Sequence, residues 1–259
     1  MSLNKPPKVK ERTVAYPHRI FNKTSIYLLK TEKITTATFD GYEVNIAIGN
    51  ITFKLQCKNK LSAYDGRIFD YVLSRIQAIG LSNTKLTFFT SEILSELGQA
   101  YRTENRNKIC TSLSNLLDVN IELKFDETTI ELSLLESVTQ IDGNFELEVT
   151  LSQSFIDAMD ASVAMTRYIN ISKTMKAKSQ YSIELAKLLQ IDGQGVNKNG
   201  EPISVKEITH SRICQYLSIE AMEETVQITT LRKAFNELAK LGYKSYSYNG
   251  RKDTWQIQK

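Results

Sequence analysis

The sequence contains little histidine and little cysteine for its 259 residues. Its two histidines, His18 and His210, and its three cysteines, Cys57, Cys110 and Cys214, are widely separated. No HExxH, HxH or CxxC pair occurs, so we expect neither a metal site nor a histidine-based catalytic centre. The odd number of scattered cysteines argues against a disulfide framework, and it predicts a reducing, cytoplasmic location.

Several other functional signatures are missing. There is no GxxxxGK[ST] phosphate-binding loop and no GxSxG nucleophile elbow. No apolar run approaches the roughly 18 residues that a membrane span needs, and the basic first residues lead into no signal-peptide core. With 4 prolines and 11 glycines, the chain is not a low-complexity polymer. These absences predict a globular binding protein of one or two domains, without enzymatic activity, cofactor or membrane partner.

The charge of the chain is small in total but uneven along the sequence. The net charge is +4, yet residues 118–160 contain eleven acidic residues and one lysine. Residues 1–33 and residues 225–259 are both basic. A local basic stretch can bind phosphate even when the net charge is modest. Most charge runs only solvate a surface, so charge by itself leaves both interpretations open.

Two stretches of the chain repeat one order of predicted elements. In the first stretch, apolar residues at helical spacing predict three helices, and alternating residues then predict strands. The helices cover residues 61–80, 90–98 and 103–119, and the strands cover residues 120–125, 128–138 and 144–151. Gly80 and Gly98 indicate where the first two helices end.

The second stretch follows the same order. Its predicted helices cover residues 179–190, 210–219 and 228–242, with a short strand over 203–209 and two strands within 243–258. Asn249-Gly250, between the last two strands, is a strong signal for a tight hairpin turn. The second helices of the two stretches, at Ser91 and Ser211, begin about 120 residues apart, which fits two domain-sized units.

Three helices followed by a β-hairpin are typical of a winged helix-turn-helix domain. We therefore expect an α+β protein with two tandem winged helix-turn-helix domains, over residues 61–165 and 166–259. Residues 1–60 are predicted to form a disordered basic arm and a small β-rich extension, packed on the first winged helix. The strand-like segments of that extension are residues 25–29, 35–39, 42–48 and 50–56.

The long helix of the second domain carries polar side chains on its outward face. These DNA-binding candidates are Thr229, Thr230, Arg232, Lys233 and Asn236. Side chains of these types read base edges in the major groove, which is about 12 Å wide. The candidates for phosphate contact are Arg251 and Lys252 at the hairpin tip, and Lys176 and Lys178 before the first helix of this domain. A solvated surface is the alternative interpretation for all of them.

The first domain carries fewer such residues. Arg102, Arg106 and Lys108 lie at the start of its third helix and are further DNA-binding candidates. The acidic stretch 118–160 is assigned to its hairpin, where carboxylates would repel the DNA backbone. We therefore expect the second domain to read DNA and the first to serve for self-association or accessory contacts. Trp255 is expected in the core, and the tyrosines of the last two strands are expected to pack there rather than stack on bases.

Specific residues in the second domain resemble a known family. They are found in three places: the serine-led helix SQYSIELAKLL, the positions Leu231, Ala234 and Glu237-Leu238 of TTLRKAFNELAKL, and the tripeptide Gly250-Arg251-Lys252. In these motifs the chain resembles the theta-type, iteron-binding plasmid replication initiator (Rep) family, whose members have two winged-helix domains. The first domain resembles the family in its order of elements only.

The resemblance implies a function in plasmid DNA replication. Members bind repeated sites, called iterons, in double-stranded origin DNA and help to open an adjacent AT-rich stretch. They recruit the host initiator and the replicative helicase. The resemblance also implies a homodimer, formed through the first domain, that represses its own promoter.

Two other function classes remain at this stage. A transcriptional regulator that binds an operator could use the same fold. A rolling-circle nicking enzyme would need a histidine-paired metal site and a nucleophilic tyrosine, and the histidines are missing. Tandem direct repeats beside the gene would favour an initiator, and a single palindrome would favour a regulator.

Overall fold

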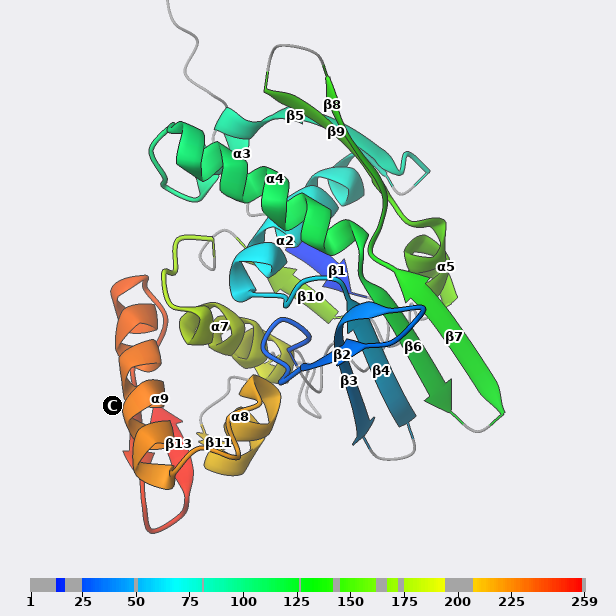
Figure 1. Cartoon of the computed structure of the whole chain (residues 1–259). Helices are drawn as coiled ribbons and strands as arrows, with labels where there is room; N and C mark the ends of the chain where they lie inside the picture. The colour runs from blue at the N-terminus through cyan, green and yellow to red at the C-terminus, as the bar shows by residue number, and fades with distance from the viewer. Residues whose placement is uncertain are drawn as a thin grey trace, which may run out of the picture.

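The structure is a computed structural model of the chain (Figure 1). It describes residues 13–16, 25–48, 51–80, 82–125, 127–141, 145–161, 167–171, 175–193 and 207–257. The helices are α2 (Ala63–Ile79), α3 (Thr90–Glu96), α4 (Thr103–Leu117), α5 (Gln153–Ala161), α7 (Gln180–Gly193), α8 (His210–Leu217) and α9 (Glu224–Lys240). The strands are β1 (Thr13–Tyr16), β2 (Glu32–Thr35), β3 (Asp40–Ile48), β4 (Ile51–Cys57), β5 (Lys85–Phe89), β6 (Asn120–Phe125), β7 (Thr128–Ser133), β8 (Leu135–Ile141), β9 (Glu146–Leu151), β10 (Arg167–Asn170), β11 (Glu207–Thr209), β12 (Tyr246–Asn249) and β13 (Thr254–Ile257).

Two units of the chain share one topology. The first unit consists of α2, β5, α3, α4 and the hairpin β8–β9, with the strand order β5-β9-β8. The second consists of α7, β11, α8, α9 and the hairpin β12–β13, with the strand order β11-β13-β12. In both units the strand before the second helix pairs with the second strand of the hairpin. This arrangement confirms the predicted α+β fold with two tandem winged helix-turn-helix units.

An extra hairpin, β6–β7, lies between α4 and the wing of the first unit. It joins the N-terminal strands in a five-stranded sheet of order β2-β3-β4-β6-β7, in which Leu55 faces Ile121. The assignment of residues 120–133 to the wing was therefore wrong, whereas residues 135–138 do lie on the wing strand β8. Strand alternation shows which face is apolar but not which strand is the partner. The predicted single strand over 128–138 breaks at the buried Leu134, where the chain passes from one sheet to the other.

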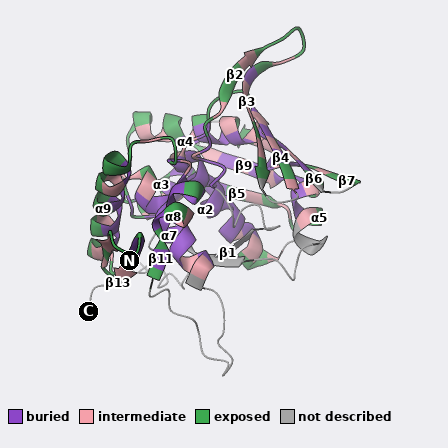
Figure 2. Ribbon diagram, turned by 90° about the horizontal axis from the view of Figure 1, so that it is seen from below, coloured by how far each residue is buried: buried purple, intermediate pink, exposed green. Residues whose placement is uncertain are grey.

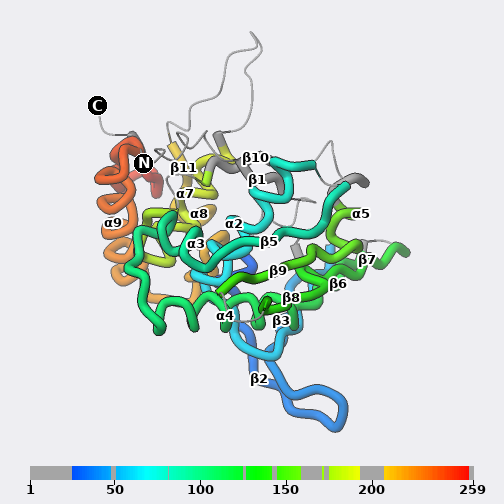
Figure 3. The backbone as a smooth tube through the Cα atoms, turned by 90° about the horizontal axis from the view of Figure 1, so that it is seen from above, coloured from blue at the N-terminus to red at the C-terminus, as the bar shows by residue number. Residues whose placement is uncertain are grey.

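The N-terminal strands β2, β3 and β4 share one sheet with the extra hairpin rather than forming a sheet of their own. The expected boundary at residue 60 falls between strands β4 and β6, which pair with each other. The β2–β3 hairpin projects from the body of the molecule (Figure 3). Residues 13–16, predicted to lie in a disordered arm, form β1 and pair antiparallel with β10.

The segment of residues 25–29, predicted as a strand, is a buried turn between the two units. Ser25 N donates a hydrogen bond to the carbonyl of Tyr216 in α8, at 3.0 Å. Tyr27 packs on Gly66 of α2, where a Cβ atom would lie only 2.7 Å from the Tyr27 ring. The apolar residues of this segment are buried against helices of both units, so their pattern reflects burial and not strand pairing.

Helix α2 lies at the centre of the molecule. It begins with a capping box, in which Asp65 Oδ2 accepts a hydrogen bond from Ser62 N at 2.7 Å and Ser62 Oγ accepts one from Asp65 N at 3.4 Å. It packs against α4 on one side and α7 on the other. One cluster of buried apolar side chains runs through both units. Figure 2 marks the buried residues along the ribbon.

A buried ion cluster joins the two units. Lys187 of α7 places its Nζ atom 2.9 Å from Asp70 Oδ2 of α2 and 3.1 Å from Glu184 Oε1. All three side chains are almost completely buried. Burial favours the neutral amine, but the two carboxylates outweigh it and raise the pKa of Lys187 above its ordinary value. Burial raises the pKa of Glu184. The relative position of the two units is thus set by paired charges as well as by apolar packing.

Candidate nucleic-acid interface

The outer face of α9 carries the residues that the sequence singled out. Leu231, Ala234, Phe235 and Leu238 are buried on the inner face. Thr229, Arg232, Lys233 and Asn236 are exposed on the opposite face, and Thr230 is half-buried between them. Arg232, Lys233 and Asn236 form no hydrogen bond or ion pair with another described residue. Their donors are therefore available to an external partner.

A buried polar network holds α9 in place. Trp255 Nε1 of β13 donates a hydrogen bond to His210 Nδ1 at 3.1 Å, so the histidine proton lies on Nε2. His210 Nε2 then donates to Gln227 Oε1 of α9, at 2.8 Å. The Gln227 amide nitrogen donates to three carbonyls of the turn between α8 and α9, those of Ile219, Glu220 and Met222. Helix α9, the turn before it and the wing are thereby fixed relative to one another.

The wing of the second unit presents two basic side chains. Arg251 and Lys252 are exposed at its tip. Because Asn249 pairs with Thr254, the loop has four residues, and the predicted two-residue Asn-Gly turn was wrong. Asn249 Oδ1 instead accepts a hydrogen bond from Arg251 N at 3.1 Å, and Asp253 takes the left-handed conformation, with φ 49°. The longer loop extends the wing tip beyond the last paired residues.

A hydrogen bond and aromatic packing stabilise the base of the wing. Tyr248 donates its hydroxyl to Asp253 Oδ1 at 2.7 Å, and this hydrogen bond raises the pKa of Tyr248 to about 12. Phe235 stacks on Tyr246 and on Trp255, with ring centres 4.9 and 4.8 Å apart. This confirms that Trp255 belongs to the core and that the wing tyrosines pack.

Glu237 ties α9 to the start of α7. Its carboxylate accepts hydrogen bonds from Lys178 N at 2.6 Å, Ser179 N at 3.2 Å and Ser182 Oγ at 2.7 Å. Burial opposes ionisation, but these bonds and the charge of Lys178 outweigh it, so the pKa of Glu237 lies below its ordinary value. The motif glutamate is therefore a positioning residue that joins two helices of the second unit.

The basic residues of the first unit are partly occupied by internal partners. Arg102 is exposed directly before α4, and Lys108 Nζ pairs with Glu104 Oε1 one turn earlier, at 2.8 Å. The guanidinium carbon of Arg106 lies 3.2 Å from the ring centre of Phe145 and 5.4 Å from that of Tyr101. Arg106 is thus held between two exposed aromatic rings, at the junction of α4 and the first wing.

The acidic residues are not concentrated on the first wing as expected. Within the described residues, Glu136, Glu146 and Glu148 lie on β8 and β9, whereas Glu122 and Glu131 lie on the extra hairpin. Asp126 and Asp142 fall outside the described residues. Glu148 is paired with Lys85 at 2.9 Å. The first wing therefore carries fewer carboxylates than expected, because part of the negative charge lies on the extra hairpin in a different sheet. The prediction that the first wing repels DNA is correspondingly weaker.

The candidate DNA-contact surfaces of the two units, which we call the recognition surfaces, lie on one side of the molecule. Figures 1 and 3 both place α9 and the loop that leads into α4 along the same side. The segment leading into α7 lies between them in Figure 1. Lys176 and Lys178 are exposed on this segment. The basic candidates of both units can therefore face one partner.

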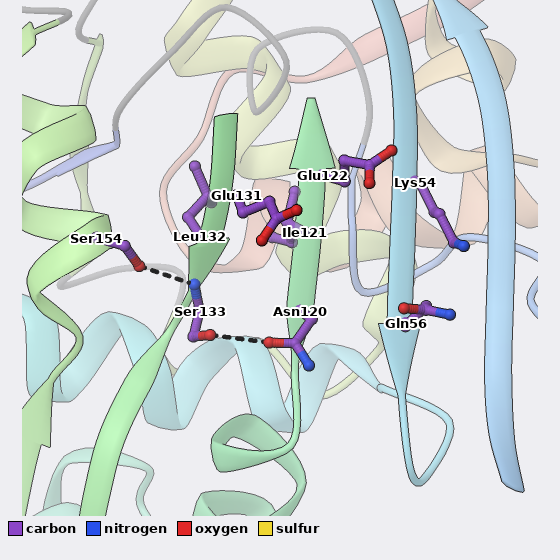
Figure 4. A pocket seen from close by; sticks show the side chains of 9 residues that line it. All are labelled: Lys54, Gln56, Asn120, Ile121, Glu122, Glu131, Leu132, Ser133 and Ser154. Carbon is purple, nitrogen blue, oxygen red and sulfur yellow. Dashed lines mark hydrogen bonds between the residues drawn. The ribbon is translucent and has the colours of Figure 1, made fainter. Parts of the chain in front are cut away.

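A cavity of about 470 Å³ lies on the five-stranded sheet, beside α5 (Figure 4). It is lined by Lys54, Gln56, Asn120, Ile121, Glu122, Glu131, Leu132, Ser133 and Ser154. Ser133 Oγ donates to Asn120 Oδ1 at 2.9 Å, and Ser133 N donates to Ser154 Oγ at 3.1 Å. The one lysine in the lining, Lys54, is already paired with Glu43 at 3.2 Å. Because two glutamates also line the cavity, it is a poor site for phosphate.

Neither a metal centre nor a membrane span is found among the residues described. No group of three metal-binding side chains comes together there. Nor does any described helix combine the length and the apolar character needed to cross a bilayer.

The comparisons with known proteins identify the architecture. No protein-family model and no curated protein sequence matches the chain. A crystal structure of the Pi initiator protein in complex with iteron DNA does match, with a TM-score of 0.60 and 11% identity over 97% of this chain and 99% of that chain. The chain shares the fold of this initiator protein. Two structures of domains 2 and 3 of RctB match the same initiator fold, with TM-scores of 0.57 and 0.54 and 11% identity, over 85% of this chain and 83% of theirs.

Three residues that hold the initiator fold together were not found by sequence reasoning. Gln227 and His210 join α8, α9 and the wing, but a lone glutamine and a lone histidine give no signal in a sequence. Arg67 lies within the apolar pattern of α2 and is buried. The same helix also buries Asp65 and Asp70, so no uniformly apolar face makes Arg67 exceptional in the sequence.

Proposed function

We propose that the chain is a plasmid DNA replication initiator that binds repeated origin sites on double-stranded DNA. The observation that carries the proposal is the outer face of α9. There Arg232, Lys233 and Asn236 have donors without internal partners, beside the basic tip of the second wing. The Pi initiator, which shares this fold, was crystallised with iteron DNA.

In this proposal α9 enters the major groove and reads base edges. Arginine recognises guanine through two parallel hydrogen bonds, and asparagine recognises adenine in the same way. Thr229 and Thr230 supply further hydroxyl contacts at the same surface. Arg251 and Lys252 contact phosphates of the adjacent backbone and hold the helix in register. The buried network of His210 and Gln227 supports this by keeping helix and wing at one fixed spacing.

The first unit adds a second contact along the same DNA. Arg102 lies directly before α4, and Arg106 and Lys108 lie within its first two turns. The buried ion cluster of Asp70, Glu184 and Lys187 supports a fixed arrangement of the two units. The protein then binds one continuous site longer than a single winged helix covers. Origin opening, recruitment of the host initiator and helicase, homodimer formation and a cytoplasmic location belong to the same proposal.

Selection of bound duplexes from a random pool tests this function with the full chain. We expect a recovered sequence that spans two successive major-groove segments and occurs as direct repeats beside the gene. The Arg232→Ala variant should lose the preference at one position, and the control Lys33→Ala, far from α9, should recover the wild-type sequence. A two-fold symmetric sequence at a promoter, without repeats, would identify a transcriptional regulator instead. Absence of any enriched sequence would contradict both functions.

A further inference from the structure

A second cavity, of about 440 Å³, lies at the junction of the two units. Its wall is formed by α2, by the turn that follows α3 and by the segment that leads into α7. The residues that determine its charge are Arg67, Glu96, Lys176 and Lys178. We call this space the junction cavity. It lies between the two recognition surfaces described above.

Arg67 is an unusual residue in the wall of the junction cavity because its charge is buried. Arg67 is only 7% exposed. Its Nη1 atom donates hydrogen bonds to the carbonyls of Met175 and Ala177, at 3.4 and 2.9 Å. Its Nε atom is buried and has no hydrogen-bond partner within the described part of the chain. The charges of Asp70 and Glu237 act on the guanidinium, but Arg67 forms no ion pair with either of them, so its Nε donor stays unused and its charge can still attract an anion.

The surroundings of Arg67 favour a negatively charged ligand. Lys176 and Lys178 are exposed on the segment whose carbonyls Arg67 holds. The one carboxylate among the residues that line the cavity is Glu96, and its Oε1 atom is paired with Arg75 at 3.5 Å. Gly98, in the turn after α3, has φ +62° and no atom within 4 Å of the position of a Cβ, so the cavity is open on that side.

We propose that the junction cavity binds one phosphate of the DNA backbone, where the duplex passes from the first unit to the second. Lys176 and Lys178 contact this phosphate, and Arg67 positions their segment through the carbonyls of Met175 and Ala177 while its buried charge adds to the attraction. The proposal rests on the DNA-binding function proposed above and adds a specific phosphate site to it. Because Arg67 belongs to the first unit and the two lysines to the second, the bound phosphate would favour the arrangement of units seen here.

The test measures the binding of the full chain to the selected duplex by fluorescence anisotropy at several salt concentrations. The test variant is Lys176→Gln with Lys178→Gln. The matched control is Lys33→Gln with Lys124→Gln, two exposed lysines on the five-stranded sheet. Losing one phosphate contact makes the log–log salt slope about 0.9 less negative. We expect this change in the test variant and an unchanged slope in the control.

A duplex series with a neutral methylphosphonate at one position at a time then locates the phosphate. We expect one position, between the two major-groove segments, to weaken binding of the wild type and to have no further effect on the test variant. Arg67→Lys, which keeps the charge but loses the paired carbonyl bonds, should reduce the effect of that position. If Arg67→Lys fails to fold, the variant Lys176→Gln with Lys178→Gln still tests the phosphate site.

The outcomes separate the two proposals. If the wild type binds DNA and the test variant shows the same salt slope and the same methylphosphonate pattern, the junction site is wrong and the DNA-binding function stands. If the wild type binds no duplex, the proposed function is wrong. In that case inorganic pyrophosphate is titrated into the wild type and the test variant. If only the wild type binds pyrophosphate, the cavity still binds an anion. If the wild type binds neither DNA nor pyrophosphate, the proposed phosphate site is wrong as well.

Discussion

The two winged-helix units have the same order of helices and strands, yet they prepare their recognition helices differently. In the second unit, α9 is held from behind by Gln227 and Glu237 while Arg232 and Lys233 remain without internal partners. In the first unit, Arg106 is packed between two aromatic rings and Lys108 is paired with Glu104. The comparison shows that one topology can leave the donors of its third helix free or occupy them with internal partners, and the proposed function assigns reading to the first case and support to the second.

The largest expected effect comes from breaking the connection between the units. Lys187→Met leaves Asp70 and Glu184 buried without a counter-charge, and such a loss costs about 3–5 kcal/mol of unfolding free energy. Urea denaturation of the full chain at neutral pH measures it. Lys33→Met, at an exposed ion pair with Asp40, is the control and should change little.

The triple variant Asp70→Asn, Glu184→Gln, Lys187→Met separates charge from packing. It removes all the buried charges together, and we expect it to recover most of the stability lost in the single variant. Equal losses in the two variants would show that the ion cluster has no special role in joining the units.

The next largest effect is the loss of DNA-binding free energy when an arginine on α9 or on α4 is replaced. Arg232→Ala should cost roughly 1–3 kcal/mol of binding free energy and relax the preference at one base pair. Arg106→Ala should weaken all sequences similarly and by less, because its guanidinium is packed on rings of the protein. Competition binding with single-base variants of the selected duplex measures both. Equal relaxation of specificity in the two variants would remove the distinction between reading and supporting surfaces.

A smaller effect is expected at the second wing. Arg251→Ala and Lys252→Ala should each make the log–log salt slope about 0.9 less negative, with no change in sequence preference. Anisotropy titrations across salt concentrations provide the measurement. A change in base preference would mean that the wing reads sequence as α9 does.

The smallest effect concerns acid stability in the second unit. The pKa of Glu237 is lowered below 4.5, so its contribution to stability is present above that pH and is lost as the pH falls through the lowered value. Glu237→Gln should reduce stability at neutral pH and flatten the acid limb of a denaturation profile. Glu127→Gln, at an exposed carboxylate, is the control. An acid limb identical to that of the wild type would show that Glu237 does not link α7 to α9 through its charge.

The parts of the fold predicted well are those with local signals. Helical spacing placed α2, α3, α4 and α8 correctly, Gly80 and Gly98 indicated where α2 and α3 end, and the outward face of α9 followed from its apolar positions. Strand pairing was predicted poorly, because β6 looks like any alternating strand and only its three-dimensional partner, β4, shows that it leaves the wing. For the same reason, the negative charge of residues 118–160 was assigned to one surface although the chain divides it between two sheets.

The candidate site shows the same limit. Arg232, Lys233, Arg251 and Lys252 could be predicted because exposed donors on a helix face and at a hairpin tip are local features. Arg67 and Gln227 could not, because each acts on segments distant in sequence, such as the carbonyls of Met175 and Ala177. The loop of the second wing was predicted too short, since the side chain of Asn249 and the left-handed Asp253 decide its length.

The pairing of β1 with β10 has a consequence for the synthesis of the protein. Thr13 lies near the beginning of the chain, but its partner, Asn170, follows the whole first winged-helix unit. During translation the first unit leaves the ribosome before β10, the only described strand that pairs with β1. β1 therefore stays unpaired until the connection to the second unit has been made. Closing so long a loop is slow, so the two-stranded sheet of β1 and β10 forms late, and β1 is exposed to wrong pairing in a nascent chain.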